Sequence, residues 1–305
     1  MKVTYILVIA ILFSSFDAAL MSQSIHDPLS ITKLKGTIKI DGLVDEPEWM
    51  GIDPFPLTQH WPDFKGEITE PTQIRIAYDD EYVYLSFICK DSEPLQIQTP
   101  TFQRDKWGMK MDQVIVGLDT YDDNENTLVF GVTASGSRID AAIKNDAQGD
   151  GVSNTSWNSY WEAKVSSNEK GWQTELKIPF SSLRFKVENN SIKMGFIAYR
   201  YIARKRELNI YPAIPPDWGF MSILKASQAQ TITFKGVKNN RPWYISPYVL
   251  AGVGHHHEES ESENLGKIAD EDFQVGIDVQ HALSDNLNAD FTLNTDFAQV
   301  EADNQ

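Results

Sequence analysis

Two strictly alternating segments near the C-terminus constrain the fold of this chain most. In residues 273–281 and 287–294 every second side chain is apolar, and most positions between are polar. The apolar positions are Phe273, Val275, Ile277 and Val279, followed by Leu287, Ala289, Phe291 and Leu293. A period of two predicts two β-strands, and the Ser-Asp-Asn segment at 284–286 predicts the turn that joins them. Such a hairpin suits an outer-membrane barrel with its apolar face in lipid, or a soluble sandwich with one buried face.

Short segments with strand character recur through most of the remaining chain. They are 36–42, 74–78, 82–89, 113–118, 127–133, 161–165, 172–178, 193–201 and 231–234. No segment keeps a long amphipathic helical period, and we expect at most one helical turn, at 180–185. Many short strands at this spacing predict an all-β fold, a jelly-roll-like β-sandwich. Gly236 and the Asn-Asn-Arg-Pro segment at 239–242 predict a boundary, after which 243–253 is expected to form another strand.

The N-terminus has the pattern of an export signal. Lys2 precedes an apolar segment at 5–13, which is too short to span a bilayer, and small residues follow at 18–24. We therefore expect a signal peptide over residues 1–24, with a retained signal anchor as the alternative. Cys89 is the single cysteine and lies in an expected strand, so we predict a buried free thiol.

Charge and motifs narrow the possible functions. The formal net charge is −16, which argues against nucleic acid or an anionic membrane surface as a partner. The sequence has no Gly-x-Ser-x-Gly, no His-Glu-x-x-His and no glycine-rich phosphate loop. Glycoside hydrolysis needs a pair of carboxylates, and a chain this acidic always supplies such pairs, so their presence decides nothing.

Five segments resemble carbohydrate-binding module family 9. They are Ile40-Asp-Gly with Trp49, residues 74–85 followed by Lys90-Asp91, residues 112–119, residues 171–179, and Gly195-Phe196. The resemblance implies a β-sandwich over residues 25–238 that binds an oligosaccharide or polysaccharide.

Residues 293–303 resemble a junction motif of a bacterial envelope family. Its members join an N-terminal domain of the family 9 type to a C-terminal outer-membrane β-barrel. The resemblance implies that 239–305 form the first antiparallel strands of such a barrel, and that more strands follow Gln305. It also implies an exported protein at the outer membrane, with the sandwich in the periplasm or at the cell surface. The polar segment 255–264 is then an external loop, although its three histidines could instead bind a transition metal.

The family resemblance also implies a sugar site. Family 9 modules stack a terminal sugar between two tryptophans, and Trp107 and Trp218 fall at matching positions. Arg104 is a candidate polar partner, whereas Ile115 and Gly131 stand where a glutamate and an arginine are expected. The alternative is that both tryptophans only cover the sandwich surface. Core packing is expected of the remaining tryptophans in strand or signature segments, namely Trp49, Trp161 and Trp172.

Calcium is the other ligand that the resemblance implies. Hard cations prefer oxygen ligands gathered in loops, and Asp119, Asp122 and Asp123 are the leading candidates. Two further acidic segments are 41–46 and 145–150. None has EF-hand spacing, and solvated acidic turns are the alternative for all three.

The sequence therefore predicts non-catalytic glycan binding by an exported, outer-membrane-associated protein that supports polysaccharide capture or uptake. Two alternatives stay open. One is a structural plug or brace of an outer-membrane barrel without sugar affinity. The other is a module associated with glycoside hydrolases, in which case any activity would be hydrolysis of O-glycosyl compounds.

Overall fold

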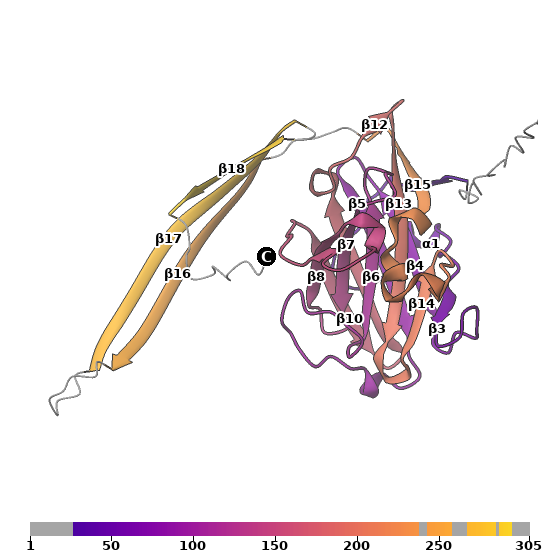
Figure 1. Ribbon diagram of the computed structural model, residues 1–305, viewed down its shortest axis with the longest axis horizontal. Coiled ribbons are helices and arrows are strands. Elements are labelled where there is room, and N and C mark those ends of the chain that lie inside the picture. Colours follow the sequence, from indigo (N-terminus) through magenta and orange to yellow (C-terminus); the bar gives the residue numbers. More distant parts are fainter. Residues whose placement is uncertain (1–26, 238–242, 258–266, 285–286, 295–305) are drawn as a thin grey trace, which may run out of the picture.

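The computed structural model describes residues 27–237, 243–257, 267–284 and 287–294. These residues form strands and short helical segments, and the first range folds into a two-sheet sandwich (Figure 1). The helical segments are α1 (Pro47–Met50) and the 3-10 turns η1 (Pro94–Gln96), η2 (Asn145–Ala147), η3 (Phe180–Ser182), η4 (Ala203–Lys205), η5 (Pro216–Trp218), η6 (Phe220–Leu224) and η7 (Ala226–Gln228). No described helix is long and apolar enough to cross a membrane.

The larger sheet has ten strands and the smaller has five. The larger sheet runs, in spatial order, β1 (Leu29–Ser30), β15 (Gln230–Lys235), β13 (Ser191–Ile202), β6 (Gln113–Asp119), β7 (Thr127–Thr133), β8 (Arg138–Ile143) and β9 (Ser153–Asn154). Joined to it are β12 (Val187–Glu188) and β14 (Glu207–Tyr211), which pair with β13, and β3 (Thr58–Trp61), which pairs with β14. The smaller sheet runs β10 (Glu162–Asn168), β11 (Gly171–Pro179), β5 (Tyr82–Lys90), β4 (Thr72–Tyr78) and β2 (Thr32–Lys33).

Apolar side chains form three layers around these two sheets. The main core lies between the sheets and includes Val114, Val116 and Phe196 from the larger sheet, and Leu85 and Phe87 from the smaller. A second cluster covers the outer face of the larger sheet, and a third packs the N-terminal segment onto the outer face of the smaller one. Because both faces of the larger sheet are covered, all seven residues of β6 are buried. Successive side chains of a strand point to opposite faces, so the odd-numbered residues of β6 face the second cluster.

The expected all-β sandwich is confirmed, and most expected strands are present with bounds that differ by at most three residues. Residues 36–42 are the exception, because they form bends and extended backbone without strand pairing. The backbone N–H groups of Asp41 and Gly42 donate to the Glu175 carboxylate and not to a neighbouring strand. The sequence analysis missed the pairing strands β3, β8 and β14. Cys89 is buried and unpaired, as predicted.

A three-stranded antiparallel sheet follows the sandwich along the chain (Figure 1). Its strands are β16 (Trp243–His257), β17 (Lys267–Ser284) and β18 (Leu287–Leu293), so the predicted C-terminal hairpin is confirmed. Residues 255–257 belong to β16, which corrects the expected loop start, and the rest of that loop lies outside the described residues. The expected signal peptide, 1–24, also lies outside them.

One face of this sheet collects the predicted apolar residues. Cross-strand pairs place Val249 opposite Val275, and Val279 opposite Phe291, and such partners share a face. Ile277 and Val279 are partly buried on this face, whereas seven other large apolar side chains there are more than half exposed: Trp243, Ile245, Val249, Phe273, Val275, Phe291 and Leu293.

Candidate functional site

A cavity of about 280 Å³ lies over the outer face of the larger sheet. Its floor includes Gln113 from β6, Tyr199 from β13 and Leu208 from β14. Tyr201 of β13 pairs with both Gln113 and Leu208, so the three floor residues come from adjoining strands. The remaining lining residues are Trp107, Gly108, Met109, Ser153, Phe220, Met221, Ile223 and Leu224.

Two segments outside the strands, the loop before β6 and the turn η6, form the walls of the cavity. The loop before β6 contributes Trp107 and Met109, which pack half-buried against the second apolar cluster. The turn η6 contributes residues at 220–224, and its buried members Ile223 and Leu224 anchor it to the same cluster. Phe220 stays 54% exposed, with its ring 5.7 Å from that of Trp61. The cavity therefore combines fixed floor residues with aromatic walls that reach solvent.

Polar groups in the cavity are few. Gln113 is only 2% exposed; its Nε2 donates to Gly108 O at 3.4 Å, while its Oε1 is buried without a hydrogen bond. Burial raises the pKa of Tyr199, so its phenol stays protonated at neutral pH and can donate a hydrogen bond. Among the residues that the structure describes, no charged side chain lines the cavity. A ligand hydroxyl that donates to Gln113 Oε1 would satisfy an acceptor that has no partner among the described residues.

Of the two tryptophans predicted to stack a sugar, the structure places one in the cavity. Trp107 is a lining residue, whereas Trp218 lies on η5, two positions before Phe220, and does not line the cavity. Trp218 is 45% exposed, and the Lys225 Nζ lies 4.8 Å from its ring centre. Lys225 also forms an ion pair with Asp146, which fixes the cation beneath the indole. The sequence analysis did not single out Gln113, Tyr199 or Phe220 as site residues.

The other predicted sugar contact, Arg104, lies outside the cavity. Its Nη2 contacts the buried carboxylate of Asp140 at 2.5 Å and donates to Asn158 Oδ1 at 2.7 Å. The side chain is therefore held by protein partners from β8 and the loop before β10.

Ile115 and Gly131 are register partners on β6 and β7, and neither presents a polar group. Ile115 is fully buried, and a Cβ built on Gly131 would lie 2.3 Å from Ile115 Cδ1. The isoleucine thus fills the space that a side chain at 131 would need. An apolar contact stands where the glutamate and the arginine were expected, and these two positions offer no polar side chain.

A buried network of ion pairs lies on the opposite face of β13, and the sequence analysis missed it. Arg200 follows the floor residue Tyr199 and points to the other side of the strand. Its Nη1 donates to Lys90 O at 2.7 Å and Thr72 Oγ1 at 3.0 Å, and its Nη2 contacts Asp91 at 3.3 Å. These partners belong to the ends of β4 and β5, so Arg200 ties the two sheets together.

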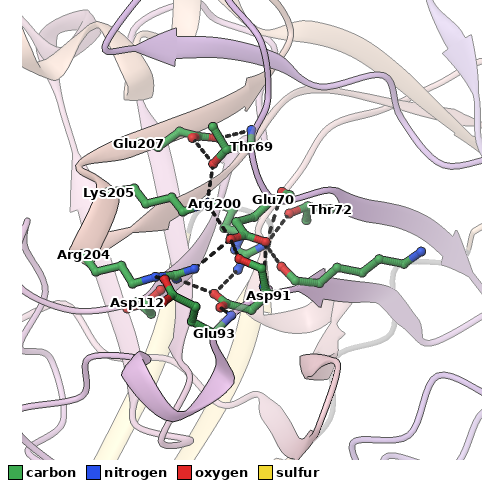
Figure 2. A network of polar contacts seen from close by, with 12 residues as sticks. Thr69, Glu70, Thr72, Asp91, Glu93, Asp112, Arg200, Arg204, Lys205 and Glu207 are labelled. Atoms are coloured by element: carbon green, nitrogen blue, oxygen red, sulfur yellow. Dashed lines mark hydrogen bonds and ion pairs between the residues drawn. The ribbon is translucent and has the colours of Figure 1, made fainter.

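Two further cations complete this network. Figure 2 shows Arg204 and Lys205, from η4, lying beside Glu70 and Asp91. Arg204 contacts both carboxylates at 2.7 Å, and Lys205 Nζ lies 2.5 Å from Glu70 Oε1. Although burial acts to raise it, hydrogen bonds from Lys205 and Ser92 lower the pKa of Glu70 to about 2. The carboxylates of the network are paired with cations, and Arg200 is next to the floor residue Tyr199 on β13. We therefore interpret the network as a structural support for the floor of the cavity.

The loops predicted to bind calcium satisfy much of their own hydrogen bonding. The Asp119 carboxylate accepts from the backbone N–H of Asp123 and Asn124, and Asp123 accepts from Glu125 and Asn126. The Asp122 carboxylate accepts from Thr231 Oγ1 at 3.4 Å. Among the residues that the structure describes, no three His, Cys, Asp or Glu side chains are grouped so that they could hold a metal ion. Calcium stays a prediction, which melting curves with calcium and with chelator would test.

Comparison with one solved structure supports the β-sandwich assignment. A protein from Bacteroides uniformis ATCC 8492, proposed to bind carbohydrate, is 15% identical with a TM-score of 0.52, over 68% of this chain and 99% of that one. A family 9 carbohydrate-binding module from Caldicellulosiruptor kristjanssonii in complex with cellotriose is 17% identical, with a TM-score of 0.48. The match covers 70% of this chain and 96% of that one. A structure of such a module from the same organism in complex with glucose is 16% identical, with a TM-score of 0.48. The match covers 70% of this chain and 98% of that one. No curated protein matches the chain.

At these identities the likeness concerns the fold alone. The family match is more direct, since residues 40–206, more than half of the chain, match the family described as Carbohydrate family 9 binding domain-like. This chain therefore belongs to that family.

Proposed function

We propose that this protein binds carbohydrate at the cavity on the outer face of the larger sheet. The observation that carries the proposal is Trp107, a half-buried aromatic residue at the wall of a cavity in a chain of the family 9 type. The C–H groups on one face of a pyranose pack on an indole ring, while amide and hydroxyl groups satisfy its hydroxyls. Gln113 and Tyr199 are suitably polar for that second task.

The size of the cavity suits a single sugar residue. Its volume of about 280 Å³ lies near the lower limit of small-molecule pockets, which is roughly 300 Å³. The aromatic Phe220 at the wall is exposed and can contact a second residue of a longer chain. We therefore expect weak binding of a terminal sugar of an oligosaccharide or polysaccharide, in the micromolar to millimolar range.

Association with the outer membrane is part of the proposal. It is supported by the face of the C-terminal sheet that carries seven exposed large apolar side chains, since such faces are rarely left in water. The acidic net charge disfavours binding to anionic lipid surfaces, so insertion into the apolar layer is the more favourable mode. Capture or uptake of polysaccharide at the envelope is the role that follows from both parts.

The test is a binding titration with the Trp107→Ala variant. We expect it to lose about 1 to 3 kcal/mol of sugar binding, the contribution of one large aromatic face. Phe102→Ala is the matched control, because Phe102 is 80% exposed and does not line the cavity. Equal binding by wild type and a folded Trp107→Ala variant would place the site elsewhere. A glycan array without any bound sugar would favour the structural brace, and release of reducing sugar would establish an enzyme.

A further inference from the structure

We propose that the cavity recognises a neutral deoxy sugar, one that has a methyl group where common hexoses have a hydroxymethyl group. This inference rests on the proposed function, because it specifies the ligand of the same site.

The first argument is the charge of the lining. In the described part of the chain, no Lys, Arg, Asp or Glu side chain lines the cavity, and Arg104 is held by Asp140 and Asn158. A uronic acid or sulfated sugar would lose hydration of its anion without gaining a cationic partner. The ligand is therefore uncharged.

The second argument is the small number of polar partners. Among the described lining residues, Gln113, Ser153 and Tyr199 have polar side chains and Trp107 adds an indole N–H, while the other seven are apolar or glycine. On the same face of the sheet, Ile115 and Gly131 form an apolar contact and add no polar group. A common hexopyranose has five hydroxyl groups, and any of them that faces one of the six apolar side chains finds no side-chain partner there.

The third argument is the composition of the walls. Met109 and Met221 provide two thioether side chains, and Ile223 and Leu224 provide branched aliphatic ones. A methyl group packs well against such carbon and sulfur atoms. A buried hydroxyl without a partner there would lower the affinity about tenfold. Removing one oxygen from the sugar should therefore strengthen binding.

The experiment compares sugars that differ only at C6, titrated against the full chain. The first series is D-glucuronate, D-glucose and D-quinovose, with carboxylate, hydroxymethyl and methyl. The second series is D-galacturonate, D-galactose and D-fucose. The third series has two members, L-mannose with a hydroxymethyl group and L-rhamnose with a methyl group. We expect the methyl member of at least one series to bind about tenfold more tightly than its hydroxymethyl partner, and both uronates to bind weakest.

Two variants test whether the preference for a methyl group arises in the cavity. Met221→Gln adds an amide to the wall and should reduce the methyl preference, whereas Met50→Gln should leave it unchanged, because Met50 is 68% exposed on α1. Hydroxymethyl sugars that bind as tightly as their methyl partners in every series would overturn this inference and leave carbohydrate binding intact. A methyl preference that Met221→Gln does not alter would also overturn it. Absence of binding in all series would remove the proposed function as well.

Discussion

Trp49 and Glu175 are joined by a buried hydrogen bond, in which the indole Nε1–H donates to Glu175 Oε1 at 3.0 Å. The other carboxylate oxygen accepts from the backbone N–H groups of Asp41, at 3.3 Å, and Gly42, at 3.2 Å. Gly42 has a φ of +89°, and a Cβ there would lie 2.8 Å from the carbonyl carbon of Val165. The Ile-Asp-Gly…Trp signature therefore holds the N-terminal segment on the smaller sheet, and its role is structural.

This arrangement predicts a pH dependence of stability. Burial raises the pKa of Glu175 to about 7, above the ordinary 4.5, although the Trp49 hydrogen bond opposes the shift. The folded state then binds the proton more tightly than the unfolded state, so the contribution of Glu175 to stability falls as pH rises from about 4.5 to 7. Glu175→Gln cannot titrate and should flatten this part of the profile, whatever its absolute stability. Urea unfolding across this range measures the slope, with the exposed Glu169→Gln as the control. Parallel profiles for Glu175→Gln and wild type would contradict the prediction.

The network around Glu70 predicts the opposite behaviour in acid. Its folded pKa of about 2 lies below the ordinary 4.5, so its contribution is present above 4.5 and is lost as pH falls towards 2. Lys205→Met removes a hydrogen bond that lowers this pKa and should cost about 1 to 2 kcal/mol at neutral pH. The difference from wild type should shrink in acid. Lys164→Met, on an exposed position of β10, is the matched control. A deficit that is the same at pH 3 and pH 7 would argue against the assignment.

The contact between Ile115 and Gly131 predicts a coupled pair of substitutions. Gly131→Ala places a Cβ against Ile115 Cδ1 and should destabilise the protein by about 1 to 3 kcal/mol. Ile115→Val removes that Cδ1, so the double variant should recover part of the loss. A double-mutant cycle from denaturant unfolding gives the coupling energy, and additive effects would mean that the two side chains do not compete for one space.

The exposed apolar face of the C-terminal sheet predicts different solution behaviour for two lengths of chain. The full chain should self-associate in buffer and become dispersed in detergent, because its apolar strand faces are exposed. Residues 31–238 should be soluble and folded alone, since every strand of the two sheets except the two-residue edge strand β1 lies within them. Sedimentation of the two forms, with circular dichroism for folding, measures this. A full chain that remains monomeric without detergent would count against membrane association.

The alternation of apolar and polar residues was enough to locate most strands, because an apolar residue at every second position indicates a strand with one buried face. It could not locate the ion-pair network, since Glu70, Asp91 and Arg200 come from distant parts of an acidic sequence that offers many such pairs. The cavity was only partly foreseen. Trp107 follows from the family resemblance, but Gln113 and Phe220 meet it only when separate strands and turns are packed together. Strand β6 also shows a limit of pattern analysis, because burial of both faces weakens its alternation.

The residues of the cavity floor and those of its wall differ in how far they can be substituted without disturbing the fold. Tyr199 and Leu208 on its floor also belong to the apolar layer that covers the larger sheet, so exchanging them would disturb folding. The turn η6 has fewer such obligations, because Phe220 is exposed and Met221 is only partly buried against this layer. A change of ligand in proteins of this architecture can therefore begin in a short turn beside the sheet, while the sheet that supports it stays the same. Engineering of this site should start at Phe220 and Met221.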